Sequence, residues 1–218
     1  EENIIQSNVP VSKVQKATDE KTKYYFKIDE DFYIVDSKDL DNFKQNASQY
    51  FKEGKVVEYN SYFEYLKENN QEFVNILGVG ANLLRSEDKK KQDFIIKLKK
   101  GEEKDLELKK YSFEKQLLAD ADKEATKKLG FNYSDITAYV RGLNSYYNHK
   151  LEEAKQSNLD TNSIIEEYNR RLKAVEDIFP GTKLVEIQGK TELINNKIDE
   201  IYSDFYKRNY AEYADKFN

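Results

Sequence analysis

The sequence contains no cysteine, no methionine and no tryptophan, and its single histidine is His149. Without cysteine the chain cannot form a disulfide, a thiolate nucleophile, an iron–sulfur cluster or a zinc ribbon. With one histidine, a metal site would depend on carboxylate and carbonyl oxygens, which suit calcium or magnesium better than zinc or copper. No motif for such a site is present, so we expect no cofactor and no metal ligands, and we identify no catalytic residues.

The missing sulfur residues also bear on location. A chain without cysteine or methionine offers no sulfur to oxidation, which suits an oxidising compartment, although drift in an AT-rich genome would give the same composition. Methionine is absent even at position 1. Removal of a secretory signal from a precursor leaves such a chain, and so does cloning of a fragment. We predict an extracytoplasmic protein, secreted or anchored to the cell envelope.

No long run of one charge or of apolar residues is present. The chain has 36 basic and 41 acidic residues, a net charge of −5, and the two signs are interleaved. Because nucleic-acid phosphates require a concentrated basic surface, we expect no nucleic-acid partner. The longest apolar stretch, 73–84, is short of the roughly 20 residues that cross a bilayer and contains two glycines and two asparagines. We predict a soluble chain without a transmembrane segment.

The first 23 residues differ from the rest of the chain. Residues 1–23 are polar, contain Pro10 and show neither helical nor strand periodicity. We predict a flexible leader there, which is also where a tether to an envelope would lie. Residues 24–218 are predicted to form a single, mainly helical domain.

Two segments show the alternation expected of strands. Residues 24–28 and 32–35 are rich in aromatic and β-branched side chains and flank the acidic loop 29–31, which predicts a hairpin with a solvated turn. The loop lacks the Asp-x-Asp-x-Asp-Gly framework of a calcium-binding EF-hand. Residues 93–110 alternate around Gly101 and favour a second hairpin, with a charged helix as the alternative.

The remainder predicts helices. Ser37 begins one that ends near Gly54, and Ser61 with Glu64 forms a capping box for a helix reaching Leu77. Further helices are predicted to end at Gly130, to begin at Ser134, to begin at Thr161 or Asn162, and to begin at Thr191, with 184–187 extended. The fold class is therefore mainly α, a multi-helix bundle-like domain with one or two small hairpins near the N-terminal half. An α+β fold is the alternative.

Two local patterns resemble functional motifs without completing them. Gly78-Val79-Gly80 has neither the third glycine nor the Lys-Ser or Lys-Thr pair of a phosphate-binding loop, so its glycines are interpreted as places where a neighbouring element packs closely. His149 and Glu153 lie four residues apart on a predicted helix. We interpret them as a local charge pair, because no second histidine could complete a metal site.

Tyrosine is the most suggestive residue type, with 17 copies. Tyrosine offers a large contact area and keeps a polar hydroxyl for water, which suits binding surfaces. Ile194, Ile198, Ile201 and Phe205 have the spacing of a helix-packing seam, and we expect Phe205 and Tyr202 to be buried beside it. The candidate interaction surface consists of Tyr206, Tyr210, Tyr213, Tyr146 and His149.

Three functions remain open. The first is a non-enzymatic, exported, lipoprotein-like helical domain that binds a protein or other macromolecule at the cell surface, or serves as a scaffold there. The second is a carboxylate-dependent hydrolase or small-ligand binder, because the 41 acids contain many close pairs, such as Asp120 with Asp122 and Glu166 with Glu167. The third is a helical homodimer with a structural role that uses the seam from Ile194 to Phe205.

Overall fold

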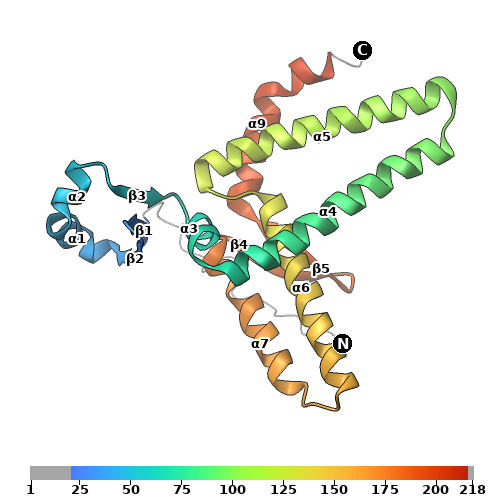
Figure 1. Ribbon diagram of the computed structural model, residues 1–218. Helices are drawn as coiled ribbons and strands as arrows, with labels where there is room; N and C mark the ends of the chain where they lie inside the picture. The colour runs from blue at the N-terminus through green and yellow to red at the C-terminus, as the bar shows by residue number, and fades with distance from the viewer. Residues whose placement is uncertain (1–20, 216–218) are drawn as a thin grey trace.

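The computed structural model describes residues 21–215, and most of them are helical, which confirms a mainly α fold with small antiparallel sheets (Figure 1). The predicted leader, residues 1–23, lies outside the described residues except for its last three. Lys23 is already the first residue of strand β1 (Lys23–Ile28).

The N-terminal hairpin is confirmed. β1 pairs antiparallel with β2 (Asp31–Asp36), and Asp29 in the turn between them has φ of 54°. A third strand that the sequence analysis did not predict, β3 (Val56–Tyr59), pairs with the other edge of β1 and gives the order β2-β1-β3. Within residues 21–215, no group of three His, Cys, Asp or Glu side chains is placed to hold a metal ion.

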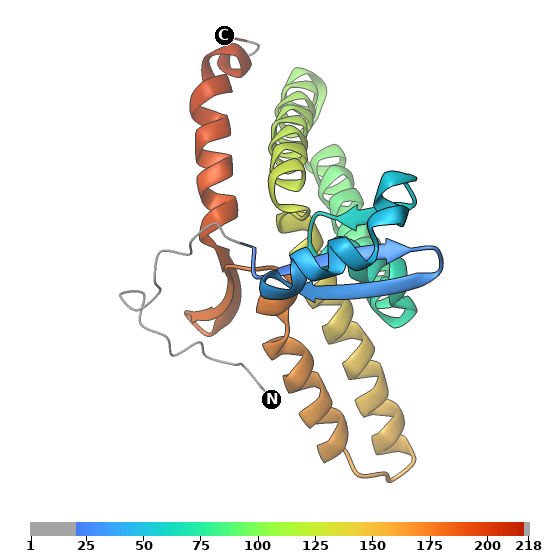
Figure 2. The ribbon, with the colours of Figure 1, turned by 90° about the vertical axis from the view of Figure 1, so that its left-hand side faces the viewer.

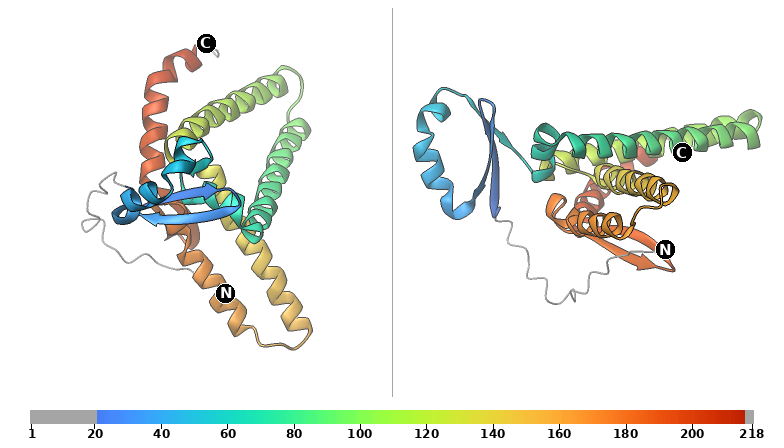
Figure 3. Two further views of the ribbon diagram at one scale, coloured as in Figure 1. Left: turned by 60° about the vertical axis from the view of Figure 1, so that its left-hand side comes forward. Right: turned by 60° about the horizontal axis from the view of Figure 1, so that its bottom comes forward.

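Short helices cover one face of this sheet, and the helix predicted from Ser37 is divided into three. They are the 3-10 helix η2 (Ser37–Asp39), α1 (Leu40–Asn46) and α2 (Ser48–Lys52). Phe43 stacks on Phe26 with ring centroids 5.1 Å apart, and Phe51 packs edge-on against Phe26 at 5.8 Å. These rings give the sheet a small core of its own, and Figure 3 shows the resulting lobe beside the helical body.

The helix predicted from Ser61 through Leu77 is two helices, α3 (Tyr62–Asn69) and α4 (Gln71–Leu98). The Ser61 hydroxyl accepts a hydrogen bond from the Glu64 N–H at 3.2 Å, as its capping role predicts. Asn70 caps α4 by accepting from the Phe73 N–H at 3.0 Å. A second cap within the predicted helix therefore marks the boundary between the two.

The hairpin predicted at 93–110 is wrong. α4 continues to Leu98, and α5 (Gly101–Leu129) begins after only two intervening residues, so the segment contains the connection between two long helices. Gly101 takes a left-handed φ of 59°, which allows the chain to reverse there. Lysine, glutamate and leucine all favour helix, and this propensity prevails over the alternation of apolar residues. Figure 1 shows α4 and α5 as an arm that projects from the body.

α6 (Tyr133–Gln156) crosses α4 at unusually close range. A Cβ atom added to Gly80 would lie 1.5 Å from the Ala138 carbonyl oxygen, and one added to Gly142 would lie 1.9 Å from that of Ile76. The interpretation of Gly80 as a packing glycine is confirmed. Gly78, in contrast, has nothing within 4 Å of an added Cβ. α6 begins at the Asn132 cap, two residues before the predicted Ser134.

The C-terminal part contains a second hairpin where a helix was predicted. After α7 (Asn162–Lys173) and α8 (Val175–Ile178), strands β4 (Thr182–Ile187) and β5 (Lys190–Asn195) pair antiparallel. Gln188 and Gly189 between them have φ of 52° and 77°, the geometry of a type I′ turn. The last helix, α9 (Asn196–Ala214), therefore begins after Thr191, and Ile194 belongs to a strand instead of the predicted helical seam.

One apolar core joins these elements. Ile198 and Tyr202 of α9 are buried in it with Ala121 and Ala125 of α5, and the expected burial of Tyr202 is confirmed. Figure 2 shows α9 beside α5, while α6 and α7 extend the other way. None of the helices in residues 21–215 combines the length and apolar character needed to cross a membrane.

The first turn of α6 carries a carboxyl that titrates unusually. Burial raises the pKa of Asp135 from 3.8 to about 6, although the hydrogen bond from the Asn132 N–H (3.0 Å) and the charge of Lys67 oppose the rise. The charges of Glu64 and Asp122 add to it. The folded protein thus binds this proton more tightly than the unfolded chain between pH 4 and 6, so stability contributed by the protonated form is lost as the pH rises through this range.

We expect Asp135→Asn to stabilise the protein by about 1–3 kcal/mol at pH 7, because the amide keeps the hydrogen-bond acceptor and removes the desolvated charge. At pH 4 the variant and the wild type should be about equally stable. Urea denaturation at the two pH values measures the difference. If the free energies of unfolding of the variant and the wild type differ by the same amount at pH 4 and pH 7, the charge of Asp135 does not cause the difference.

Candidate functional site

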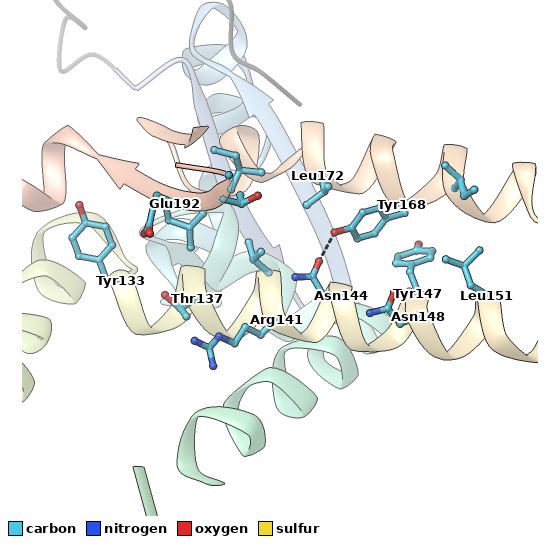
Figure 4. A pocket seen from close by; sticks show the side chains of 16 residues that line it. Tyr133, Thr137, Arg141, Asn144, Tyr147, Asn148, Leu151, Tyr168, Leu172 and Glu192 are labelled. Carbon is cyan, nitrogen blue, oxygen red and sulfur yellow. Dashed lines mark hydrogen bonds between the residues drawn. The ribbon is translucent and has the colours of Figure 1, made fainter. Parts of the chain in front are cut away.

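A cleft of about 610 Å³ lies between α6, α7 and the β4–β5 hairpin (Figure 4). α6 forms one long wall, while α7 and the hairpin together form the facing wall. Its lining side chains mix hydroxyls, amides and aliphatic groups: Tyr133, Thr137, Val140, Arg141, Asn144, Tyr147, Asn148, Leu151, Ile165, Tyr168, Leu172, Leu184, Thr191, Glu192 and Leu193, together with Gly189.

The α6 wall follows from helical periodicity. Thr137, Asn144, Asn148 and Leu151 recur at three-, four- and seven-residue intervals and so project from one face of the helix. Asn144 accepts a hydrogen bond from the Tyr168 hydroxyl of α7, which links the two walls (Figure 4). A hydrogen bond between polar side chains therefore holds the two walls of the cleft together.

The tyrosines of the cleft remain neutral at physiological pH. Burial raises the pKa of Tyr133, Tyr147 and Tyr168 above the ordinary value of 10. Hydrogen bonds to carboxylates add to the rise for the first two: Tyr133 donates to Asp199, and Tyr147 donates to Glu167 at 2.8 Å. Neutral phenols can donate and accept hydrogen bonds but cannot act as phenolate bases.

Few charged groups line the cleft. Arg141 is paired with Glu87 of α4, and in Figure 4 its side chain turns toward that helix. Glu192 is the single carboxylate among the lining residues of the described chain. A glycosidase-type mechanism requires two carboxyls across one cleft. This cleft presents groups suited to hydrogen bonding and apolar contact.

The edge of β5 borders the cleft, and hydrogen bonds at its end fix the direction of its backbone groups. The Asn195 N–H donates to the Tyr133 hydroxyl at 3.2 Å, and that hydroxyl lies 3.0 Å from the Asn195 carbonyl oxygen. Opposite Asn195, the Thr182 N–H donates to the Phe179 carbonyl at 3.0 Å. Both residues thus direct their backbone groups away from the partner strand, and they form a non-hydrogen-bonded pair.

In an antiparallel ladder, hydrogen-bonded and non-hydrogen-bonded pairs alternate, so every second residue of β5 directs its backbone groups as Asn195 does. Leu193 and Thr191 lie two and four residues from Asn195, so their N–H and C=O groups also point outward from β5. Both residues line the cleft, and neither outward N–H makes a hydrogen bond to another residue within 21–215. Tyr133 occupies the place of a neighbouring strand at Asn195, and the next two positions of the edge are open.

The predicted tyrosines of α9 differ in exposure. Tyr210 is 69% exposed, whereas Tyr206 is half-buried against the core. Tyr213 donates a hydrogen bond of 2.5 Å to Asp120 of α5 and packs edge-on against Phe113. Whether the three bind a partner stays a prediction.

The other two predicted residues belong to α6, which extends away from α9 (Figure 1). Tyr146 contacts Tyr147 edge-on, and the Lys150 ammonium lies 4.5 Å from the Tyr146 ring centroid. His149 is exposed, and its Nε2 lies 3.1 Å from the Glu153 carboxylate, which is the predicted local pair. The structure therefore does not bring the five candidate residues together in one patch.

The close acidic pairs are engaged with tyrosines. Asp122 accepts a hydrogen bond from Tyr202 of α9, as Asp120 does from Tyr213 and Glu167 from Tyr147. The first two bonds join α5 to α9 and the third joins α6 to α7, so these tyrosines and acids stabilise the tertiary structure. The cleft was not predicted because Thr191 was assigned to a helix, although Gln188-Gly189 between alternating runs was an available hairpin signal.

No protein-family model, curated protein or solved structure matches this chain.

Proposed function

We propose that the protein is a non-enzymatic binding protein that holds an extended segment of another polypeptide in the cleft, as an additional strand on the edge of β5. The observation that carries the proposal is the open edge at Thr191 and Leu193 inside a cleft. An exposed strand edge recognises main-chain groups, so it suits a polypeptide better than a ligand without an amide backbone.

The shape and lining of the cleft support a peptide ligand. Its volume of about 610 Å³ is within the usual range for binding pockets. Alternate side chains of an added strand would enter it, where Val140, Leu172 and Leu193 offer apolar contact. Asn144 and Asn148 can pair with amide groups of the ligand. A peptide with apolar residues at every second position fits this arrangement.

The chemistry of the lining favours binding without catalysis. Neutral tyrosines, amides and a single carboxylate provide neither a base–nucleophile pair nor two opposed acids. The alternative proposal, a small-ligand binder or carboxylate-dependent hydrolase, would have to use Glu192 with a group outside the cleft lining.

The proposal places the protein outside the reducing cytosol, at the cell envelope, with a cell-surface or exported protein as its partner. The absence of both sulfur residues supports this location. Fractionation of the source cells with an antibody against the chain tests it, and recovery in the cytosolic fraction would contradict it.

Removing one outward N–H from β5 should weaken peptide binding. Thr191→Pro deletes that donor at an edge position where proline leaves the β4–β5 ladder intact. For a capped pentapeptide of alternating serine and leucine, measured by calorimetry, we expect Kd to rise about tenfold, the equivalent of one hydrogen bond of about 1.4 kcal/mol.

The matched control is Glu186→Pro, directly opposite Thr191 in the ladder but with its N–H on the far edge of β4. This variant should bind like the wild type. Equal losses in both variants would mean that proline disturbs the hairpin as a whole. No binding by the wild type to the pentapeptide or to a longer unfolded polypeptide would refute the proposal.

A further inference from the structure

The far end of the α4–α5 arm exposes apolar side chains. Phe94, Ile96 and Leu98 are 63%, 52% and 61% exposed, and Leu106 of α5 is 47% exposed. The 28 residues of α4 make a helix about 42 Å long, so this end is well separated from the body (Figure 1). We name residues 89–110 the arm tip. Phe94, Ile96 and Leu98 lie within a span of five residues at the end of α4, and such a group of exposed apolar side chains is unusual on a surface in contact with water.

The arm tip is also basic, in contrast to the chain as a whole. Residues 89–100 contain six lysines and one aspartate, a net charge of +5, whereas the whole chain carries −5. The lysines at 89, 90, 91, 97 and 100 are exposed. With the acids at the start of α5 included, residues 89–110 still carry +4, and Glu103 is paired with Lys99 at 3.0 Å.

We propose that the arm tip docks on the surface of an anionic lipid bilayer. Charge complementarity identifies the partner: lysines are attracted to anionic headgroups, while their aliphatic stems and the neighbouring Phe, Ile and Leu side chains enter the boundary of the acyl chains. The inference is independent of the cleft, because none of the arm-tip residues lines it.

The placement of the apolar groups favours a bilayer over a protein partner. Phe94 and Leu98 are four residues apart and share a helix face, whereas Ile96 lies on another side of α4. A protein usually recognises a single helix face or a concave groove. A convex tip that is apolar on more than one side is better accommodated by a fluid headgroup layer.

Vesicle co-sedimentation of the full chain tests the proposal. The vesicles consist of phosphatidylcholine alone, or of equimolar phosphatidylcholine and phosphatidylglycerol. We expect binding to the anionic vesicles, at least tenfold weaker binding to the neutral ones, and weakening by added salt. The triple variant Phe94→Ser, Ile96→Ser, Leu98→Ser should reduce the bound fraction at least tenfold, as should Lys89→Gln, Lys90→Gln, Lys91→Gln.

Matched controls separate the arm tip from general surface properties. Leu159→Ser removes a side chain that is 66% exposed between α6 and α7, and Lys38→Gln, Lys44→Gln, Lys52→Gln removes three exposed lysines from the N-terminal lobe. Both should bind anionic vesicles like the wild type. Circular dichroism of every variant confirms that the helices are retained.

Three results would overturn the proposal. They are no binding of the wild type to the anionic vesicles, equal binding to neutral and anionic vesicles, and equal losses in the arm-tip and control variants. A self-association detected by light scattering that the serine variant abolishes, without vesicle binding, would instead make the arm tip an interface between two copies of the chain.

Discussion

Gly80→Ala is expected to destabilise the protein by about 3 kcal/mol or more, a large part of the 5–15 kcal/mol that holds a typical domain folded. The added Cβ would lie 1.5 Å from the Ala138 carbonyl oxygen and within 3 Å of two further backbone atoms of that residue. No rotamer change relieves a clash with backbone, so α4 and α6 would have to separate. Because α4 carries the arm and α6 forms one wall of the cleft, the separation of the two helices should disturb both the arm and the cleft.

The same substitution two residues earlier provides the control. Gly78 has open space around an added Cβ and lies in the same helix, so Gly78→Ala should stabilise the protein by about 0.5–1 kcal/mol through helix propensity. Thermal and urea denaturation of the two variants measure the contrast. If Gly80→Ala leaves the free energy of unfolding unchanged or raises it, α4 and α6 cross farther apart than the distances at Gly80 indicate.

Asn195→Ala should cost about 3 kcal/mol, because this fully buried side chain satisfies three groups at once. Its Nδ2 donates to the Thr182 hydroxyl at 2.8 Å and to the Pro180 carbonyl at 3.2 Å. Its Oδ1 accepts from the Ile198 N–H at 3.1 Å and caps α9. Truncation loses the cap, worth about 1 kcal/mol, and leaves buried polar partners unsatisfied at about 1–3 kcal/mol.

Asn70→Ala is the matched comparison for Asn195→Ala. Asn70 caps α4 through one hydrogen bond to the Phe73 N–H and is only half-buried, so its loss should cost about 1 kcal/mol. Urea denaturation gives both free energies of unfolding. If the two substitutions cost the same, the bonds to Thr182 and Pro180 do not contribute measurably.

The Asn195 network also connects stability with the cleft. Asn195 ends β5, begins α9 and bonds through its backbone to Tyr133 of α6. The open edge at Thr191 and Leu193 is therefore supported at one end by this residue. In Asn195→Ala we expect weaker pentapeptide binding even under conditions where the protein remains folded.

Local signals in the sequence determined the fold class and several boundaries. Aromatic and β-branched runs around Asp29 predicted the first hairpin, and Gly130 marked the end of α5. The close packing at Gly80 and the pair of His149 with Glu153 were also predicted. Apart from the packing at Gly80, which joins α4 to Ala138 of α6, each of these depends on residues within a few positions of one another, which is the range over which propensity and capping act.

Two segments carry conflicting local signals. The segment 93–110 alternates like a strand but is helical because its helix propensity prevails, and the segment after Gln188 was assigned to a helix although Gln188-Gly189 signals the hairpin in which β5 pairs with β4. The tertiary structure decided the rest. The cleft, the open edge of β5 and the tyrosine–carboxylate bonds join residues from different elements. Such contacts arise when distant segments are brought together by burial of a shared core, and no local pattern encodes which segments will meet.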